Sequence, residues 1–159
     1  MSLFTARPEK LLLSNGATLA YHRSPGRSPG VVFLGGFTSD MTGIKATTLE
    51  QWCRGRGQTF VRFDYTGHGA SSGQFTEGTI GGWTEEAVTV LDQLTEGPQL
   101  LVGSSMGAWL MLLTALARPE RIVGLLGLAC AADFTGYLLW ERLDDPLRDR
   151  LQRERVISL

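Results

Sequence analysis

Histidine and cysteine are scarce in this sequence, and both side chains commonly bind metals or take part in proton transfer and redox chemistry. The 159 residues contain 2 histidines, His22 and His68, and 2 cysteines, Cys53 and Cys130. Because the patterns around the cysteines predict a helix and a strand, neither a disulfide framework nor a paired-thiolate metal site is supported. We therefore expect a reducing compartment, no metal ion and no other cofactor.

An excess of charge and long apolar runs are also absent. The chain has 15 basic and 16 acidic residues, which gives a formal net charge of −1. Its basic residues form no stripe and do not alternate with aromatic ones, so nucleic acid is not expected as a partner. Residues 1–7 lack the apolar stretch of a secretory signal, and no later run is long enough to span a membrane. We expect a soluble, cytoplasmic protein.

The pattern along the chain predicts a single domain, residues 1–159, that opens with a hairpin. The turn Ser14-Asn15-Gly16 joins two short strand patterns and predicts a β-hairpin over residues 10–22. After a Pro/Gly/Ser loop over residues 24–30, strand and helix patterns alternate from residue 31 to residue 133. Strands are predicted over residues 31–34, 60–63, 99–104 and 122–129, and helices over 44–54, 83–94 and 106–117.

Such alternation is typical of parallel strands joined by crossover helices, with helices on both faces of the sheet. The predicted fold is thus α/β, a three-layer sandwich around a mostly parallel sheet. In the helix over residues 83–94, Glu85 and Glu86 are placed in the first turn, where carboxylates oppose the helix dipole. Residues 137–155 are rich in leucine and charge and predict a further helix. Residues 134–159 are interpreted as the start of a lid or, alternatively, as an ordinary surface helix.

A Gly-x-Ser-x-Gly motif, from Gly103 to Gly107, follows an apolar strand and opens a helical pattern. In a nucleophile elbow the serine sits in a strained backbone conformation with its hydroxyl exposed, which requires small residues two positions to either side. Gly103 and Gly107 meet that requirement. Serine between glycines is often only a turn residue, but the strand before it and the helix after it favour Ser105 as a nucleophile.

The first predicted parallel strand ends in Leu34-Gly35-Gly36-Phe37. Its two glycines allow the backbone to turn so that the Phe37 amide faces the serine. Together with the Met106 amide at the start of the following helix, this amide would give two donors for the negative charge of a tetrahedral intermediate. The alternative interpretation is an ordinary turn from strand to loop.

Three other polar residues are weaker candidates. His68 lies between glycines in a tight loop, where it can satisfy local backbone groups without reaching Ser105, and His22 lies on the hairpin. Asp133 follows the strand over residues 122–129, where some proteins of this fold carry a catalytic acid, but a loop or capping role is favoured. In hydrolases with this elbow the acid and the histidine come later in the chain, and no histidine follows Ser105.

Six blocks of the sequence carry a specific resemblance. They are residues 34–41 (LGGFTSDM), 62–67 (RFDYTG), 97–99 (GPQ), 101–107 (LVGSSMG), 117–120 (ARPE) and 131–133 (AAD). Over residues 31–133 the chain resembles the α/β-hydrolase superfamily, and within it the branch of mitochondrial acyl-protein (palmitoyl) thioesterases that also cleave acyl glucuronides. The resemblance implies Ser105 as the nucleophile and the Phe37 and Met106 amides as oxyanion donors. It also implies an aspartate after a seventh strand and a histidine after an eighth, both beyond this chain.

We therefore expect a serine hydrolase that acts on thioester or ester bonds of small-molecule or acyl-protein substrates through a Ser105 acyl-enzyme. The chain as written is expected to be nearly inactive, since losing the base of a serine hydrolase costs on the order of 10⁶ in turnover. A non-catalytic acyl-binding fragment and a peptidase or carboxylesterase of the same fold are the alternatives. The strand over residues 122–129 would present an unpaired apolar edge, so self-association is also expected.

Overall fold

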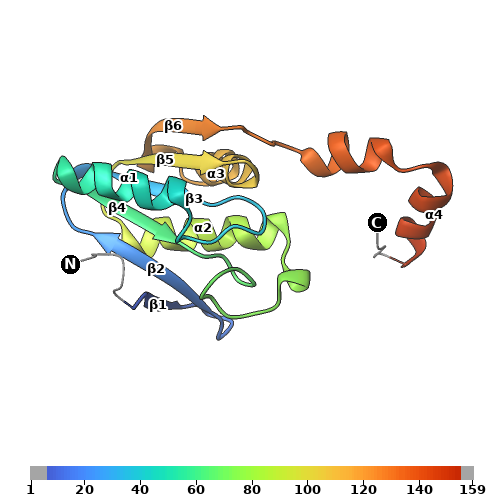
Figure 1. The fold of residues 1–159 in the computed structure, drawn as a ribbon, viewed down its shortest axis with the longest axis horizontal. Helices are drawn as coiled ribbons and strands as arrows, with labels where there is room; N and C mark the ends of the chain where they lie inside the picture. The colour runs from blue at the N-terminus through green and yellow to red at the C-terminus, as the bar shows by residue number, and fades with distance from the viewer. Residues whose placement is uncertain (1–6, 155–159) are drawn as a thin grey trace.

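The predicted hairpin and the alternating segments join one sheet. In the computed structural model, which describes residues 7–154, its strand order is β1-β2-β4-β3-β5-β6 (Figure 1). β1 pairs antiparallel with β2 and β2 antiparallel with β4, whereas β4, β3, β5 and β6 run parallel. The strands are β1 Glu9–Leu12, β2 Thr18–Ser24, β3 Arg27–Leu34, β4 Gln58–Phe63, β5 Gln99–Ser104 and β6 Ile122–Leu128.

Helices cover both faces of this sheet, as the alternating pattern predicts. α1 (Ile44–Gly55) packs against β4 on one face, and α2 (Ile80–Leu94) and α3 (Met106–Ala117) contact each other on the opposite face (Figure 1). The three-layer α/β fold is thereby confirmed. Among residues 7–154, no helix combines the length and the apolar character needed to cross a membrane.

The central strand β3 is buried on both faces. Val31 and Phe33 pack with Cys53 of α1, while Val32 and Leu34 join the larger core beneath α2 and α3. Successive side chains of a strand point to opposite faces, so one run of four apolar residues serves both cores. This double burial explains why the segment is continuously apolar and holds the residues that follow it in a defined position.

Strand β3 is longer than the sequence predicts. It begins at Arg27, which pairs with Gln58 of β4, and the register then shifts before Val31 pairs with Phe60. The predicted loop over residues 24–30 is therefore partly strand. Its two prolines and two glycines obscured the strand pattern, because both residue types are uncommon in regular strands.

The expectation for Glu85 and Glu86 is wrong. α2 begins at Ile80 with Thr79 as its N-cap, so both glutamates lie beyond the first turn. Glu86 is buried and accepts hydrogen bonds from the Thr66 backbone N–H at 2.9 Å and the Thr66 hydroxyl at 2.6 Å. Burial raises the pKa of Glu86, partly offset by these bonds. Glu86 therefore anchors the loop after β4 instead of opposing the helix dipole.

The segment after β6 runs away from the sheet (Figure 1). It contains a π-helical turn, η4 (Thr135–Leu139), a short 3₁₀ turn, η5 (Trp140–Arg142), and α4 (Asp145–Glu154). No side chain of α4 is buried. The start of a lid within residues 134–159 stays a prediction. Residues 155–159, and residues 1–6 of the predicted single domain, lie outside the described residues.

The outer strand β6 leaves one side of the sheet uncovered. It pairs with β5 alone in the described sheet, and its apolar side chains Val123, Leu125, Leu126 and Leu128 are 36% to 57% exposed. A groove of about 740 Å³ separates this strand from α1 and is lined mainly by apolar residues, with Lys45, Thr48 and Gln58 among them. The predicted unpaired apolar edge is therefore present.

Candidate functional site

The carboxyl ends of the parallel strands bring the predicted site residues together. Leu34 at the end of β3 lies beside Gly103 of β5, and Ser104 lies beside Leu128 at the end of β6. The loops that leave these strands therefore begin at one edge of the sheet. In an open α/β sheet this is the edge at which ligands bind.

Ser105 sits at the junction between β5 and α3 with an unusual backbone. Its φ of 54° and ψ of −121° lie outside the right-handed helical and extended regions, although it is not glycine. Its N–H donates to the Leu128 carbonyl at 2.9 Å, and its own carbonyl accepts from the amides of Ala108 at 3.0 Å and Ala131 at 3.3 Å. Hydrogen bonds from its N–H and to its carbonyl thus hold the strained Ser105 backbone in place. Ser105 is only partly buried.

The glycines that flank Ser105 allow this sharp turn. A Cβ atom on Gly103 would lie 2.5 Å from the Cα of Ala108, and one on Gly107 would overlap the carbonyl oxygens of Leu34 and Gly35. The first turn of α3 is consequently pressed against the ends of β3 and β5. The sequence interpretation of both glycines as small residues required by packing is consistent with these contacts.

Residues with strained backbone conformations are concentrated at the carboxyl ends of the parallel strands. Within residues 7–154, the non-glycine residues with a positive φ are Thr38, Ser105, Ala129 and Asp133, and each follows the end of β3, β5 or β6. Such conformations cost on the order of 1–3 kcal/mol each and persist only where the surroundings enforce them. Their concentration around one serine marks this edge as the candidate functional site.

The loop after β3 approaches the same serine. A Cβ on Gly36 would lie 3.4 Å from the Cβ of Ser105 and 3.1 Å from the Ser104 carbonyl oxygen. The next residue, Phe37, has an N–H with no hydrogen-bond acceptor among the described residues. Met106 opens α3, so its N–H has no acceptor within the helix. Met106 therefore follows Ser105 directly in the chain, and the loop that carries Phe37 lies beside Ser105 in space.

The loop after β3 is tied down at Met41. Its N–H donates to Asp64 Oδ1 at 2.6 Å, and its carbonyl accepts from Arg62 Nη1 at 2.8 Å. Asp64 Oδ2 also accepts from the Ala70 N–H at 2.8 Å, which joins the loop after β4 to the same carboxylate. Burial raises the pKa of Asp64, opposed by these two backbone bonds. The sequence analysis did not identify Asp64 and Arg62 as residues that fix this loop, although Asp64 directly follows a buried strand.

A buried ion pair with Glu50 fixes the position of the Arg62 side chain. Its Nε lies 2.7 Å from Glu50 Oε2, both side chains are at most 8% exposed, and Ser24 donates to Glu50 Oε1 at 2.8 Å. Burial acts to raise the pKa of Glu50, but the hydrogen bonds from Ser24 and Arg62 outweigh it, so that pKa is lowered. Arg62 thus connects α1, β4 and the loop that carries Phe37.

His68 lies in an aromatic cluster instead of beside Ser105. Its ring contacts Tyr65, Phe75 and Trp83 with centroids 5.0 to 5.7 Å apart, and it is 4% exposed. Its Nδ1 lies 3.2 Å from the Thr66 carbonyl, and its Nε2 has no partner within the described chain. No hydrogen bond joins it to Ser105 in residues 7–154. The expectation that His68 settles local backbone bonds is consistent with this placement.

The two remaining candidates are also apart from Ser105. His22 lies on β2 beside Arg62, and β4 and β3 separate β2 from β5. Burial and then the nearby Arg62 lower the pKa of His22. Asp133 is exposed, and its carboxylate lies over Gly136 at the start of the segment after β6. A loop role for Asp133 fits this position.

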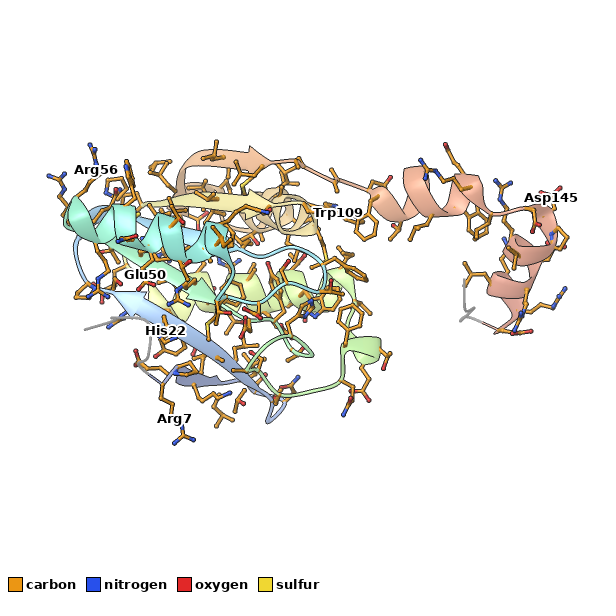
Figure 2. The ribbon with its side chains drawn as sticks, in the orientation of Figure 1. Arg7, His22, Glu50, Arg56, Trp109 and Asp145 are labelled. Carbon is orange, nitrogen blue, oxygen red and sulfur yellow. The ribbon has the colours of Figure 1, made fainter. Side chains whose placement is uncertain are left out.

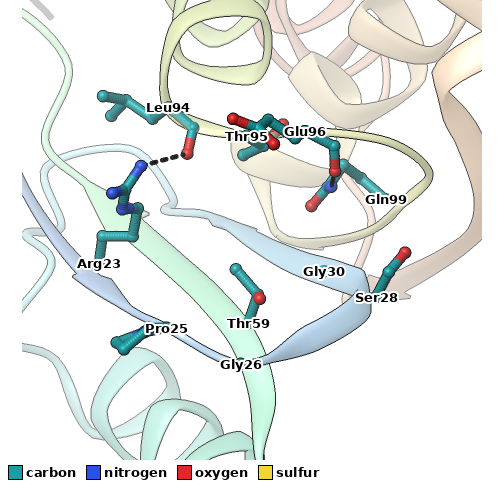
Figure 3. Close-up of a pocket in the computed structure, with 10 residues that line it drawn as sticks. All are labelled: Arg23, Pro25, Gly26, Ser28, Gly30, Thr59, Leu94, Thr95, Glu96 and Gln99. Carbon is teal, nitrogen blue, oxygen red and sulfur yellow. Dashed lines mark hydrogen bonds between the residues drawn. The ribbon is translucent and has the colours of Figure 1, made fainter.

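A pocket of about 350 Å³ with a mixed polar and apolar lining lies at the opposite end of the sheet (Figure 3). Arg23 reaches across it to donate to the Leu94 carbonyl at 3.3 Å, and the Gln99 side-chain amide donates to the Glu96 carbonyl at 2.8 Å. Gln99 starts β5, whereas Ser105 follows its end. This pocket is therefore separate from the candidate site.

Comparison with known proteins agrees with this architecture. The profile described as "Alpha/beta hydrolase family" matches residues 31–157. The chain belongs to the alpha/beta hydrolase family. One curated relative is "Palmitoyl-protein thioesterase ABHD10, mitochondrial" of Homo sapiens. It is 49% identical over 141 residues, which cover 89% of this chain and 46% of the relative. The Mus musculus protein of that name is 50% identical over 115 residues, 72% of this chain and 39% of the relative.

Two solved structures resemble this alpha/beta hydrolase chain. "Alpha/beta hydrolase domain-containing protein 10 from mouse" has a TM-score of 0.89 and 41% identity, over 97% of this chain and 61% of that one. A putative hydrolase from Agrobacterium vitis S4 has a TM-score of 0.82 and 34% identity, over 92% and 62%. The fold and the family resemblance are confirmed. The chain spans less than half the length of the curated relatives above.

The expectation of a cytoplasmic location is wrong, because the curated relatives are named as mitochondrial proteins. It was based on the lack of an apolar signal near residue 1. Mitochondrial transit peptides are amphipathic and rich in arginine and serine, so the lack of an apolar stretch does not argue against them.

Proposed function

We propose that the protein is a serine hydrolase that cleaves the thioester or ester bond of a small-molecule or acyl-protein substrate. Its support is the strained Ser105 at the junction of β5 and α3, held beside the Gly36-Phe37 loop. Membership of the alpha/beta hydrolase family makes hydrolysis the expected chemistry, and the relatives named as palmitoyl-protein thioesterases favour acyl thioesters.

In this mechanism Ser105 Oγ attacks the carbonyl carbon of the substrate, and the carbonyl π electrons move onto its oxygen. The Phe37 and Met106 N–H groups donate to that oxyanion and stabilise it without reorganisation. Collapse of the tetrahedral intermediate expels the thiol or alcohol, which takes up a proton, and leaves an ester on Ser105. Water then attacks this acyl-enzyme by the same route and releases the carboxylic acid.

The Ser105 proton needs an acceptor, and neither histidine of the chain is placed to take it. His68 is enclosed by aromatic rings, and His22 lies across the sheet. The 159-residue chain is therefore expected to turn over close to the residual rate of a serine hydrolase without its base, on the order of 10⁶ below the complete enzyme. The same placement favours the second candidate function, a fragment that binds acyl ligands without hydrolysis.

A fluorophosphonate probe is expected to label Ser105 slowly but selectively. The polarised phosphorus reacts with a strained serine beside two amides faster than with an ordinary surface serine. Peptide mass spectrometry should find the adduct on Ser105, and Ser105→Ala should abolish it. The matched control is Ser39→Ala, an exposed serine of the neighbouring loop, which should label like the unmodified chain.

Absence of any Ser105 adduct after prolonged incubation would contradict the hydrolase proposal and favour the binding fragment. Substrate type is tested separately, by comparing acylation of Ser105 with matched thioester, oxyester and amide donors. Faster acylation by the amide would point instead to a peptidase of the same fold.

We also propose that β6 mediates self-association of the 159-residue chain. The strand contains no charged residue and no proline, features that usually protect an edge. Antiparallel pairing with a second copy would satisfy the free backbone groups of this edge and bring the exposed leucines of the two copies side by side. Light scattering coupled to gel filtration should find dimers or larger species that increase with concentration. Leu126→Lys at the edge should shift the mass to the monomer, and a monomer for the unmodified chain would contradict the proposal.

A further inference from the structure

A pocket walled by aromatic rings lies beside the Phe37 loop. We call it the aromatic pocket; its volume is about 330 Å³, and it is lined by Phe37, Phe75, Thr76, Gly78, Thr79, Ile80, Trp83, Phe134 and Thr135. The Phe37 ring is its centre, with centroids 5.0 Å from Phe75, 6.0 Å from Phe134 and 6.5 Å from Trp83. Three segments distant in the sequence therefore supply one apolar hollow.

The aromatic pocket is connected to Ser105 by short stretches of backbone. Phe37 directly follows Gly36, whose position packs against Ser105. Phe134 comes three residues after Ala131, which donates to the Ser105 carbonyl. Its ring also contacts Trp109, on the first turns of α3, at 5.9 Å (Trp109 is labelled in Figure 2). The loops that position Ser105 are thus the same loops that supply Phe37 and Phe134 to the pocket.

The lining excludes charge. No acidic or basic side chain contributes to the aromatic pocket. The one strong aromatic donor, the Trp83 indole N–H, is already bonded to the Thr66 carbonyl at 3.1 Å, so the ring presents carbon to the pocket. Phe37 remains 47% exposed despite three ring contacts. An exposed phenylalanine in an apolar hollow is suited to a partner that is itself apolar.

The volume limits the size of that partner. Because a water molecule occupies about 30 Å³ in the liquid, 330 Å³ corresponds to roughly eleven non-hydrogen atoms. An acyl chain of about ten carbons, or a phenylpropanoyl group, would fill this space. Carbons beyond that number would project from the pocket and stay in water.

We propose that the aromatic pocket binds the apolar acyl group of the substrate and selects medium-chain or arylalkyl acyl groups over long-chain ones. The inference depends on the proposed function, since the acyl group is the one that becomes attached to Ser105. Phe37 then has two roles in one residue: its N–H faces the oxyanion, and its ring contacts the acyl group. Phe75, Trp83 and Phe134 determine how long that group is.

Calorimetric titration of the 159-residue chain with straight-chain carboxylates of 4, 6, 8, 10 and 12 carbons tests this assignment. Each carbon that is buried should tighten binding about fourfold, and the gain should stop near ten carbons. Phe75→Ala enlarges the pocket and should move that limit to longer chains. Trp52→Ala, which removes an exposed ring on α1 at the other face, should leave the limit where it is.

Affinity that does not depend on chain length would overturn the proposal, as would a length limit that Phe75→Ala leaves unchanged. Circular dichroism of Phe75→Ala identifies a variant that does not fold, and Phe134→Ala then serves as a second test of the same wall. Fluorophosphonate labelling reports on Ser105 independently. Length-dependent binding without labelling would therefore refute the hydrolase and leave the pocket assignment standing.

Discussion

Gly107→Ala is expected to lower the free energy of unfolding by about 3 kcal/mol or more, despite the better helix propensity of alanine. The added methyl group would overlap the Leu34 and Gly35 carbonyl oxygens. Neither oxygen can retreat easily, because β3 is buried on both faces and paired with β4 and β5. Urea denaturation followed by circular dichroism measures the change.

Gly81→Ala is the matched control. Gly81 also lies inside a helix, α2, but a Cβ there would meet nothing within 4 Å. This variant should gain stability by about 0.5–1 kcal/mol from helix propensity alone. Equal effects of the two alanines would mean that α3 is not pressed against the strand ends, and the account of the Ser105 turn would fail.

Arg62→Met is expected to cost about 3–5 kcal/mol at pH 7, because it removes the buried partner of Glu50 and leaves that carboxylate with only the half-exposed Arg54, 3.7 Å away. It also removes the donor that holds the Met41 carbonyl, so the loop carrying Phe37 should lose protection from amide hydrogen exchange. Both effects are measurable on one sample, by denaturation and by exchange.

The pH dependence of that cost has a definite sign. In the unmodified chain the Glu50 pKa lies below its ordinary value of 4.5, so its contribution to stability is present above pH 4.5 and is lost as the pH falls through the lowered pKa. Arg62→Met removes two of the causes that lower the Glu50 pKa, the hydrogen bond and the charge of Arg62, so acid neutralises the carboxylate at a higher pH than in the unmodified chain. The difference between Arg62→Met and the unmodified chain should shrink towards pH 4.

The double variant Glu50→Gln with Arg62→Met serves as the control, since it carries no buried unpaired charge. It should recover part of the stability lost in Arg62→Met and show a weaker pH dependence. A double variant as unstable as the single one would mean that the ion pair contributes only through packing.

Periodicity predicted the sheet, its helices and the Ser105 junction because those features depend on local pattern. Apolar runs such as residues 31–34 and 99–104 can be buried only in a sheet covered on both faces. The need for glycine at positions 103 and 107 around Ser105 was also predictable, because a Cβ at either position would clash with the backbone of a neighbouring strand or helix.

Features assembled from distant segments were not predictable in this way. Glu86 and Asp64 are buried because amides of two separate loops bond to them, which no local pattern indicates. The ring contacts of Phe37 join three segments that are neighbours only after folding. Both sets of contacts depend on the tertiary structure, so no local sequence pattern predicts them.

The central claim, that the turn at residue 105 presents a nucleophile to an acyl carbonyl, is tested most directly by Ser105→Cys in a Cys130→Ser background. A thiol needs no histidine to react, and burial raises the pKa of the remaining Cys53 to about 11, which keeps it unreactive. Intact-mass spectrometry should record transfer of an octanoyl group from a small thioester to residue 105 at least tenfold faster than to Ser39→Cys in the same background. Equal or slower transfer at residue 105 would contradict the account.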